Sequence, residues 1–191
     1  MYVALGDSLT AGVGASKREL AYPNQLSQRL ANQKGESVEL YNFGIPGATA
    51  ADVVSRELPE LENLKGANIV TIFIGVNDIL NRTPLDQFQS EISQITDVAL
   101  SHSQHVYLVT IPTIGSRALF LPPYRLYFGW QTRRYNEASL EALKGKSVTI
   151  LDLYNFNKQA EKENEFYSLD LFHPSDIGYT LWTNFFYGAL Q

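Results

Sequence analysis

Three polar motifs that lie far apart in the sequence carry the residue types needed for nucleophilic catalysis. They are Gly-Asp-Ser-Leu at 6–9, Gly-Val-Asn-Asp at 75–78 and Asp-Leu-Phe-His-Pro at 170–174. A serine hydroxyl is a weak nucleophile unless a neighbouring base takes its proton, and a third group must hold that base. Ser8, His173 and Asp170 are therefore a candidate triad, in which Asp170 would fix the tautomer of His173 and stabilise its imidazolium.

Acyl transfer at Ser8 also needs hydrogen-bond donors for the oxyanion of its tetrahedral intermediate. The candidates are the backbone N–H of Ser8, the backbone N–H of Gly47 and the side-chain amide of Asn77. Each such donor typically stabilises the transition state by about 3–4 kcal/mol. Donors and triad come from separate stretches of the chain, so the fold must bring these stretches to one place.

Five short apolar runs, rich in β-branched and aromatic residues, predict buried strands. They span 2–5, 38–42, 69–74, 106–111 and 148–153. Most are too continuous to have one solvated face, which is typical of parallel strands covered on both sides. Helical patterns alternate with them and predict a three-layer α/β/α sandwich, with a five-stranded parallel sheet in flavodoxin-like order. We expect a single domain over residues 1–191.

The helical patterns between the strands have recognisable boundaries. Candidate helices lie at 22–32 and 133–143, and a last one opens at Ser175. Thr49 and Asp52 resemble a capping box, and we expect that helix to end before Pro59. Thr83 is expected to cap another helix, with Pro84 at its first position.

The predicted topology gives the three motifs a common location. In open parallel sheets, ligands bind beyond the carboxyl ends of the strands. The motifs at 6–9 and 75–78 follow the first and third strands and share this edge, and the loop at 170–174 can return to it. We therefore expect their polar side chains to meet in one crevice.

The set of motifs resembles the SGNH hydrolase family, also called GDSL esterases and lipases. The stretch Asn-Phe-Gly-Ile-Pro-Gly-Ala-Thr at 42–49 adds a fourth matching block, and motif order and spacing agree over nearly the whole chain. The resemblance implies Ser8 as nucleophile, with His173 and Asp170 completing the triad. It also implies Ser8, Gly47 and Asn77 as the oxyanion donors.

The glycine block departs slightly from the family pattern. Ile45 and Pro46 stand where the family often carries small or polar residues. Gly44 competes with Gly47 for the donor role. We prefer Gly47, because it stands just before Ala-Thr in the usual register of the family.

Four further titratable residues are expected to have supporting or unrelated roles. Asp7 and Asp78 are predicted to accept hydrogen bonds from the loop backbone and so hold Ser8 and Asn77 in place. His102 and His105 flank the start of the fourth strand. That is the amino edge of the sheet, opposite the predicted site, so we expect them to be solvated or to cap the strand.

Residues 118–130 form an apolar stretch after the fourth strand. Its prolines argue against a regular helix, and it is expected to overhang the carboxyl edge. Two interpretations remain open: a packed connecting loop, or an acyl-binding wall over the site, since a long apolar loop is costly unless it covers or binds something. In the second case the candidate substrate-binding residues are Phe120, Leu121, Tyr124, Tyr127 and Phe128.

Composition excludes several other functions. The formal net charge of −5 leaves no basic footprint for nucleic acid. Without cysteine the chain has no thiolate nucleophile or cysteine-ligated zinc, and its three histidines make a multi-histidine site improbable. We expect neither a metal nor an organic cofactor. No run approaches the ~18 apolar residues of a transmembrane helix.

Compartment and oligomeric state are not determined by the sequence. The chain enters its first predicted strand directly after Met1, with no charged leader or apolar signal region. We expect a cytoplasmic protein if Met1 is the native start, and a secreted one if a leader has been removed.

The predicted function is hydrolysis of small-molecule carboxylic esters through an acyl-enzyme. The apolar stretch favours lipid-like or short-to-medium acyl esters. The alternative within enzymes is a carbohydrate O-deacetylase, which should show aromatic platforms and hydroxyl-binding groups around an open groove. The alternative from another class is a non-catalytic flavodoxin-like module.

Overall fold

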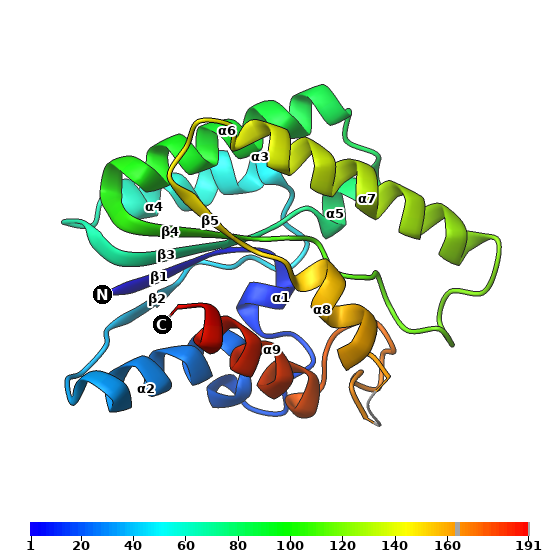
Figure 1. The fold of residues 1–191 in the computed structure, drawn as a ribbon, viewed down its shortest axis with the longest axis horizontal. Helices are drawn as coiled ribbons and strands as arrows, with labels where there is room; N and C mark the ends of the chain where they lie inside the picture. The colour runs from blue at the N-terminus through cyan, green and yellow to red at the C-terminus, as the bar shows by residue number, and fades with distance from the viewer. Residues whose placement is uncertain (163–164, 191) are drawn as a thin grey trace.

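A computed structural model describes residues 1–162 and 165–190 and contains a five-stranded sheet. The strands are β1 (Tyr2–Gly6), β2 (Leu40–Asn42), β3 (Ala67–Phe73), β4 (Ser103–Val109) and β5 (Val148–Leu151). Their order is β2-β1-β3-β4-β5, and every neighbouring pair is parallel (Figure 1). This order confirms the predicted α/β fold with flavodoxin-like topology.

Helices cover both faces of the sheet (Figure 1). One layer consists of α2 (Tyr22–Lys34), α8 (Leu153–Ala160) and α9 (Asp176–Ala189). The other consists of α3 (Ala50–Asp52), α4 (Leu58–Glu62), α6 (Leu85–His102) and α7 (Tyr124–Ala142). The short helices α1 (Ser8–Ala11) and α5 (Val76–Asn81) begin at the carboxyl edge, just after β1 and β3.

An aromatic cluster fixes α9, and with it the loop that precedes this helix. Tyr22 of α2 packs edge-on against Phe186 with ring centroids 5.2 Å apart, and Phe73 of β3 lies 5.5 Å from Trp182. All four rings are buried. Because each buries a large apolar area, this contact holds the start of α9 beside the carboxyl ends of β1 and β3.

The helix that begins after Thr49 does not end before Pro59, as the sequence predicted. The predicted capping box is present, with the Thr49 N–H donating to Asp52 Oδ2 at 2.9 Å. A π-helical turn (Val53–Glu57) follows, and Pro59 then lies in the first turn of α4, where a helix needs no N–H donor. The chain therefore continues past Pro59, and the wider turn directs Glu57 toward β1.

Two other helix starts also differ from the prediction. Helix α6 begins at Leu85, with Pro84 as its cap residue and no side-chain cap, so Thr83 does not cap it. Helix α7 begins at Tyr124 rather than at 133, so the prediction of no regular helix over 118–130 is wrong for the second half. The prolines precede the first helical residue, where they interrupt no helical hydrogen bond.

Candidate active site

The three predicted triad side chains lie in one hydrogen-bonded line. His173 Nε2 is 2.9 Å from Ser8 Oγ, and His173 Nδ1 is 2.6 Å from Asp170 Oδ2. Ser8 begins α1 directly after β1, whereas the other two come from the loop before α9. The arrangement is that of a hydroxyl, a base within reach of its proton, and a carboxylate that orients the base.

Asp170 is held as a carboxylate by several donors. Its Oδ1 accepts hydrogen bonds from the Ser168 hydroxyl and from the backbone N–H groups of Phe172 and His173, at 2.8–2.9 Å. Partial burial acts to raise its pKa, but these bonds and the one from the His173 ring outweigh it and hold the pKa well below its usual range. Asp170 therefore stays ionised at neutral pH, as an orienting group for His173 requires.

Two of the predicted oxyanion donors are free to bind a ligand. The backbone N–H groups of Ser8 and Gly47 make no hydrogen bond to any other described residue. Gly47 has φ of +83°, a left-handed conformation that favours glycine. By contrast, the N–H of Gly44 donates to Asn42 Oδ1 at 3.0 Å. Gly44 is thus engaged in the loop, and Gly47 remains the candidate donor.

The side-chain amide of Asn77 is oriented by two acceptors. Its Nδ2 donates to the Ala48 carbonyl at 2.9 Å and makes a longer contact of 3.4 Å to Asp7 Oδ2. The longer contact is weak, so this N–H of Asn77 is only loosely held by Asp7. Asn77 lies at the start of α5, so β3 and β1 together bring its amide to the Ser8 side of the crevice.

Asp7 and Asp78 have the supporting positions that the sequence predicted. Both are buried, and Asp7 Oδ1 accepts from the Leu9 N–H at 2.9 Å, while Asp78 Oδ2 accepts from the Ala50 N–H at 3.0 Å. Burial raises the pKa of Asp7 to about 7 and that of Asp78 to about 6, against the opposing effect of these hydrogen bonds. Asp7 thus accepts from the backbone of the turn that contains Ser8, and Asp78 links the turn that contains Asn77 to the start of α3.

A third buried acid, Glu57, was missed by the sequence analysis. Its Oε2 accepts a hydrogen bond of 2.8 Å from the Gly6 N–H, two residues before Ser8, and Glu57 is 1% exposed. Burial raises the pKa of Glu57 to about 8, although the Gly6 bond opposes this shift. The local sequence Ser-Arg-Glu gave no signal, because only the π-helical turn directs this side chain inward.

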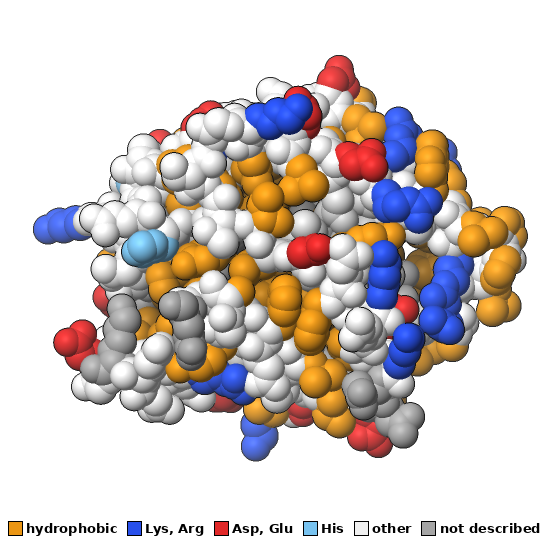
Figure 2. Space-filling view, viewed as in Figure 1, with side chains coloured by type: hydrophobic (Ala, Val, Ile, Leu, Met, Phe, Trp, Pro, Cys, Tyr) orange, Lys and Arg blue, Asp and Glu red, His pale blue; other side chains and the backbone are white. Residues whose placement is uncertain are grey.

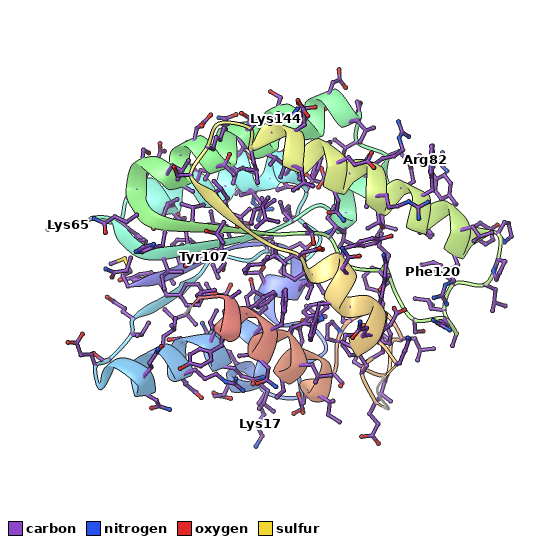
Figure 3. All side chains as sticks on the ribbon, viewed as in Figure 1. Lys17, Lys65, Arg82, Tyr107, Phe120 and Lys144 are labelled. Atoms are coloured by element: carbon purple, nitrogen blue, oxygen red, sulfur yellow. The ribbon has the colours of Figure 1, made fainter. Side chains whose placement is uncertain are left out.

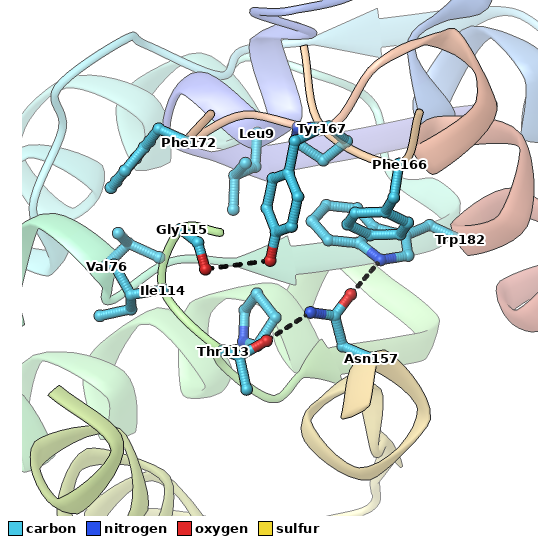
Figure 4. Close-up of a pocket in the computed structure, with 12 residues that line it drawn as sticks. Leu9, Val76, Thr113, Ile114, Gly115, Asn157, Phe166, Tyr167, Phe172 and Trp182 are labelled. Atoms are coloured by element: carbon cyan, nitrogen blue, oxygen red, sulfur yellow. Dashed lines mark hydrogen bonds between the residues drawn. The ribbon is translucent and has the colours of Figure 1, made fainter. Parts of the chain in front are cut away.

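A small pocket, with a volume of about 20 Å³, lies beside the triad motifs (Figure 4). Leu9, Val76 and Phe172 line it next to the catalytic motifs, and the loop after β4 supplies Pro112 and Ile114. A hydrogen-bonded chain stiffens the floor, from Trp182 Nε1 through Asn157 to the Thr113 hydroxyl (Figure 4). The wall is mainly apolar and suits a small apolar group attached to the reacting carbon.

Comparison with known proteins decides the family. Residues 4–181 match the GDSL-like lipase/acylhydrolase family. The chain belongs to this family. The spore germination lipase LipC of Bacillus licheniformis is 27% identical over 195 residues, covering 93% of this chain and 90% of the relative.

Solved structures agree with the fold of this GDSL hydrolase. A crystal structure of TesA has a TM-score of 0.80 and 20% identity, covering 100% of this chain and 97% of that one. Axe2, an acetylxylan esterase from Geobacillus stearothermophilus, has a TM-score of 0.71 and 19% identity, covering 97% and 91%. At these identities the structures establish the fold, while the family match identifies the chain as a carboxylic ester hydrolase.

The candidate substrate-binding residues of this GDSL hydrolase do not line the pocket themselves. Phe120 and Phe128 are half-buried and pack on each other, with ring centroids 4.8 Å apart. Leu121, Tyr124 and Tyr127 are exposed on the outer side. The ring of Phe120 lies against Gly115, which does line the pocket, so the Phe pair supports the pocket wall from outside.

The other two histidines, His102 and His105, lie away from this site. His102 ends α6 at the amino edge of the sheet, where its Nδ1 is 3.0 Å from the Val98 carbonyl, and His105 lies in the first part of β4. Within residues 1–162 and 165–190, no group of three or more His, Cys, Asp or Glu side chains is arranged to hold a metal. None of the helices described is long and apolar enough to span a membrane.

Proposed function

We propose that this GDSL hydrolase cleaves carboxylic esters by two-step acyl transfer with Ser8 as nucleophile. Ser8 Oγ attacks the ester carbonyl while His173 Nε2 takes its proton, and the alcohol leaves with that proton. Water activated by His173 then hydrolyses the acyl-enzyme, and Asp170 stabilises the imidazolium in both steps. The observation that carries this proposal is the hydrogen-bonded line from Asp170 through His173 to Ser8.

The oxyanion of each tetrahedral intermediate is assigned to three donors. They are the free N–H groups of Ser8 and Gly47 and the amide of Asn77. These donors are held in place before the substrate arrives, which lowers the reorganisation needed in the transition state.

The substrate class we favour is lipid-like or short-to-medium acyl esters. The pocket beside Ser8 is mainly apolar, and the surface beyond it carries exposed leucines and aromatic residues. A relative that is 27% identical is named a lipase. An acyl group that begins in the small pocket and extends over the apolar surface beyond it would remove apolar area from water on both sides, which favours binding as the chain lengthens.

The second candidate is a carbohydrate O-deacetylase. Tyr124, Tyr127 and Trp130 are exposed in the first turns of α7 and offer aromatic platforms of the kind on which sugar rings stack. A neighbour with the same fold is named an acetylxylan esterase. The small pocket beside Ser8 suits the methyl of an acetyl group better than a longer chain. A non-catalytic module is disfavoured, because the triad geometry is complete.

Hydrolysis of p-nitrophenyl esters from acetate to palmitate, with Ser8→Ala in parallel, tests these alternatives. Activity that peaks at medium or long chains and is lost in Ser8→Ala supports a lipid-type esterase. Activity confined to acetate favours deacetylation. Undiminished activity in Ser8→Ala, measured on folded protein, contradicts the nucleophile assignment.

A further inference from the structure

Among the described residues, six of the twelve exposed large apolar side chains lie in one segment, residues 119–130, which we call the arm. Leu121 and Tyr124 are each 65% exposed and Leu126 is 71% exposed, and Leu119, Tyr127 and Trp130 are also exposed. Figure 2 shows the corresponding patch of hydrophobic side chains at the end of the molecule where α7 begins. A surface patch of this kind on a soluble domain marks an interaction site.

The arm is tied to the loop that carries Asp170 and His173. The Ser116 N–H, at the base of the arm, donates to the Leu171 carbonyl at 2.8 Å. Leu169 and Leu171 in that loop are themselves exposed, Leu169 completely. The base of the arm and this loop are therefore joined beside the pocket, which both line through Gly115 and Phe172, and we call their exposed apolar side chains the rim of the site.

The charge around the arm is opposite in sign to that of the whole chain. No acidic residue occurs between Asp97 and Glu137, while Arg117, Arg125, Arg133 and Arg134 fall in this interval. Only Arg125 of these four makes an ion pair within the described part of the chain, to Glu161 at 3.7 Å. Lys and Arg side chains lie beside the apolar patch in Figure 2. A chain of net charge −5 thus carries a local basic surface at its apolar end.

We propose that the arm docks this hydrolase onto an anionic lipid bilayer, with the rim of the site facing the lipid. The leucines would enter the acyl boundary, and Tyr124 and Trp130 suit the headgroup level, where amphipathic rings are favoured. The arginines then face anionic headgroups. This inference rests on the proposed function, because docking places the pocket where lipid-like esters are concentrated.

A second copy of the chain fits this surface less well than a bilayer does. In a two-fold symmetric dimer the same patch meets itself. The arginines beside the patch would then approach their own equivalents, and like charges repel. An anionic bilayer instead satisfies both the apolar and the basic parts of the surface.

Binding is tested by co-sedimentation with vesicles of phosphatidylcholine and phosphatidylglycerol, in a Ser8→Ala background that removes turnover. We expect Leu126→Asp to weaken partitioning about tenfold or more, because it removes an exposed leucine that would enter the bilayer and adds a charge. The matched control is Leu140→Asp, an exposed leucine farther along the same helix α7, which should leave binding unchanged.

The electrostatic part is tested with Arg117→Gln, at an exposed position just before the arm, and with vesicles of phosphatidylcholine alone. We expect Arg117→Gln to weaken binding to the anionic vesicles about fivefold, and added salt to weaken wild-type binding. Lys65→Gln is the control, since Lys65 lies at the end of the molecule opposite Phe120 (Figure 3). Equal binding to neutral and anionic vesicles would overturn the proposal.

Three further results would overturn the docking proposal. The first is that the wild-type chain does not bind vesicles, and the second is that Leu126→Asp and Leu140→Asp bind them equally. The third is that the wild-type chain binds no vesicles but forms a concentration-dependent dimer, which Leu126→Asp converts to monomer. Hydrolysis of soluble p-nitrophenyl acetate, with Ser8 intact, is measured separately. If the chain with Ser8 intact binds vesicles but does not hydrolyse this ester, the proposed function is refuted. If it hydrolyses the ester but does not bind vesicles, only the docking proposal is refuted.

Discussion

The nucleophile turn and the arm lie at the same edge of the sheet, but they are held in opposite ways. The turn at 6–12 is fixed by distant groups: Glu57 accepts from Gly6, and Asn42 donates to the Thr10 carbonyl at 2.8 Å. The arm is attached mainly at its base and through the Arg125–Glu161 ion pair, and its outer side chains are exposed. Reacting groups need fixed geometry, whereas a surface that receives apolar ligands needs exposed area.

This difference predicts where substitutions act. Changes in the turn and its supports should lower kcat or stability for every ester, because they disturb atoms that all substrates use. Changes in the arm should alter the preference among substrates and leave the chemistry of small esters intact. The following substitutions test this division, in order of decreasing effect.

Asp170→Asn should have the largest effect among substitutions that keep Ser8. It leaves the shape of the loop but removes the charge that stabilises the His173 imidazolium, so kcat should fall about 10³–10⁴-fold. The measurement is steady-state hydrolysis of p-nitrophenyl acetate. Asp86→Asn, an exposed carboxylate at the start of α6, is the control and should match the wild type. Equal activity of the two variants would contradict the role of Asp170.

Asn77→Ala should lower kcat about 10²–10³-fold with a smaller change in KM. The amide acts on charge that develops only in the transition state, so its loss affects kcat more than ground-state binding. Asn81→Ala changes an exposed amide on the same short helix and serves as the matched control. A loss confined to KM would show that Asn77 binds the substrate rather than the oxyanion.

Substitutions of Glu57 test whether its hydrogen bond to Gly6 stabilises the turn that carries Ser8. Glu57→Leu leaves the buried Gly6 N–H without its acceptor and should cost about 1–3 kcal/mol in the free energy of unfolding. Glu57→Gln keeps an acceptor oxygen and should cost less. Chemical denaturation of the two variants measures the difference, and equal losses would argue against this hydrogen bond.

The same residue predicts a pH dependence with a definite sign. Because the folded-state pKa of Glu57 is raised to about 8, its contribution to stability is complete below its ordinary value and is lost as pH rises through about 8. Relative to Glu57→Gln, the wild type should lose up to about 1.4 kcal/mol per pH unit in this window. Parallel pH profiles for the two proteins would contradict burial of an ionisable group here.

Phe120→Ala should have the smallest effect and should act on selectivity. Its ring supports the pocket wall at Gly115, so we expect the ratio of kcat/KM for octanoate over acetate to fall by roughly threefold to tenfold. Activity toward acetate should change little. An equal loss of kcat/KM for both esters would show that Phe120 affects the reacting groups themselves. It would contradict the view that the arm acts only on substrate preference.

The sequence predicts the parts of the site that local motifs carry. Ser8, Asn77 and the loop with His173 each follow a strand or precede a helix with a clear signal, and parallel strands bring such positions to one edge. The alternation of apolar runs with helical patterns likewise predicts a parallel sheet between two layers of helices. The register of the family motif favours Gly47 over Gly44 as the candidate oxyanion donor. The hydrogen bond from the Gly44 N–H to Asn42 agrees with this preference.

Long-range features could not be predicted in this way. In the sequence, Glu57 is indistinguishable from a polar residue on the exposed face of a helix. Only the π-helical turn before Pro59 brings its side chain to Gly6. The rule that a helix ends before proline assumes regular α-helical hydrogen bonding, which this turn does not have. The pocket wall joins Thr113 and Tyr167 from separate loops, and neither has a local signal of function.

The most direct test of the account is covalent labelling with a fluorophosphonate probe, followed by peptide mass spectrometry. The triad geometry predicts a single adduct on the peptide that contains Ser8, absent in Ser8→Ala and much slower to form in His173→Ala. An adduct on another residue, or undiminished labelling of Ser8→Ala, would contradict Ser8 as the nucleophile.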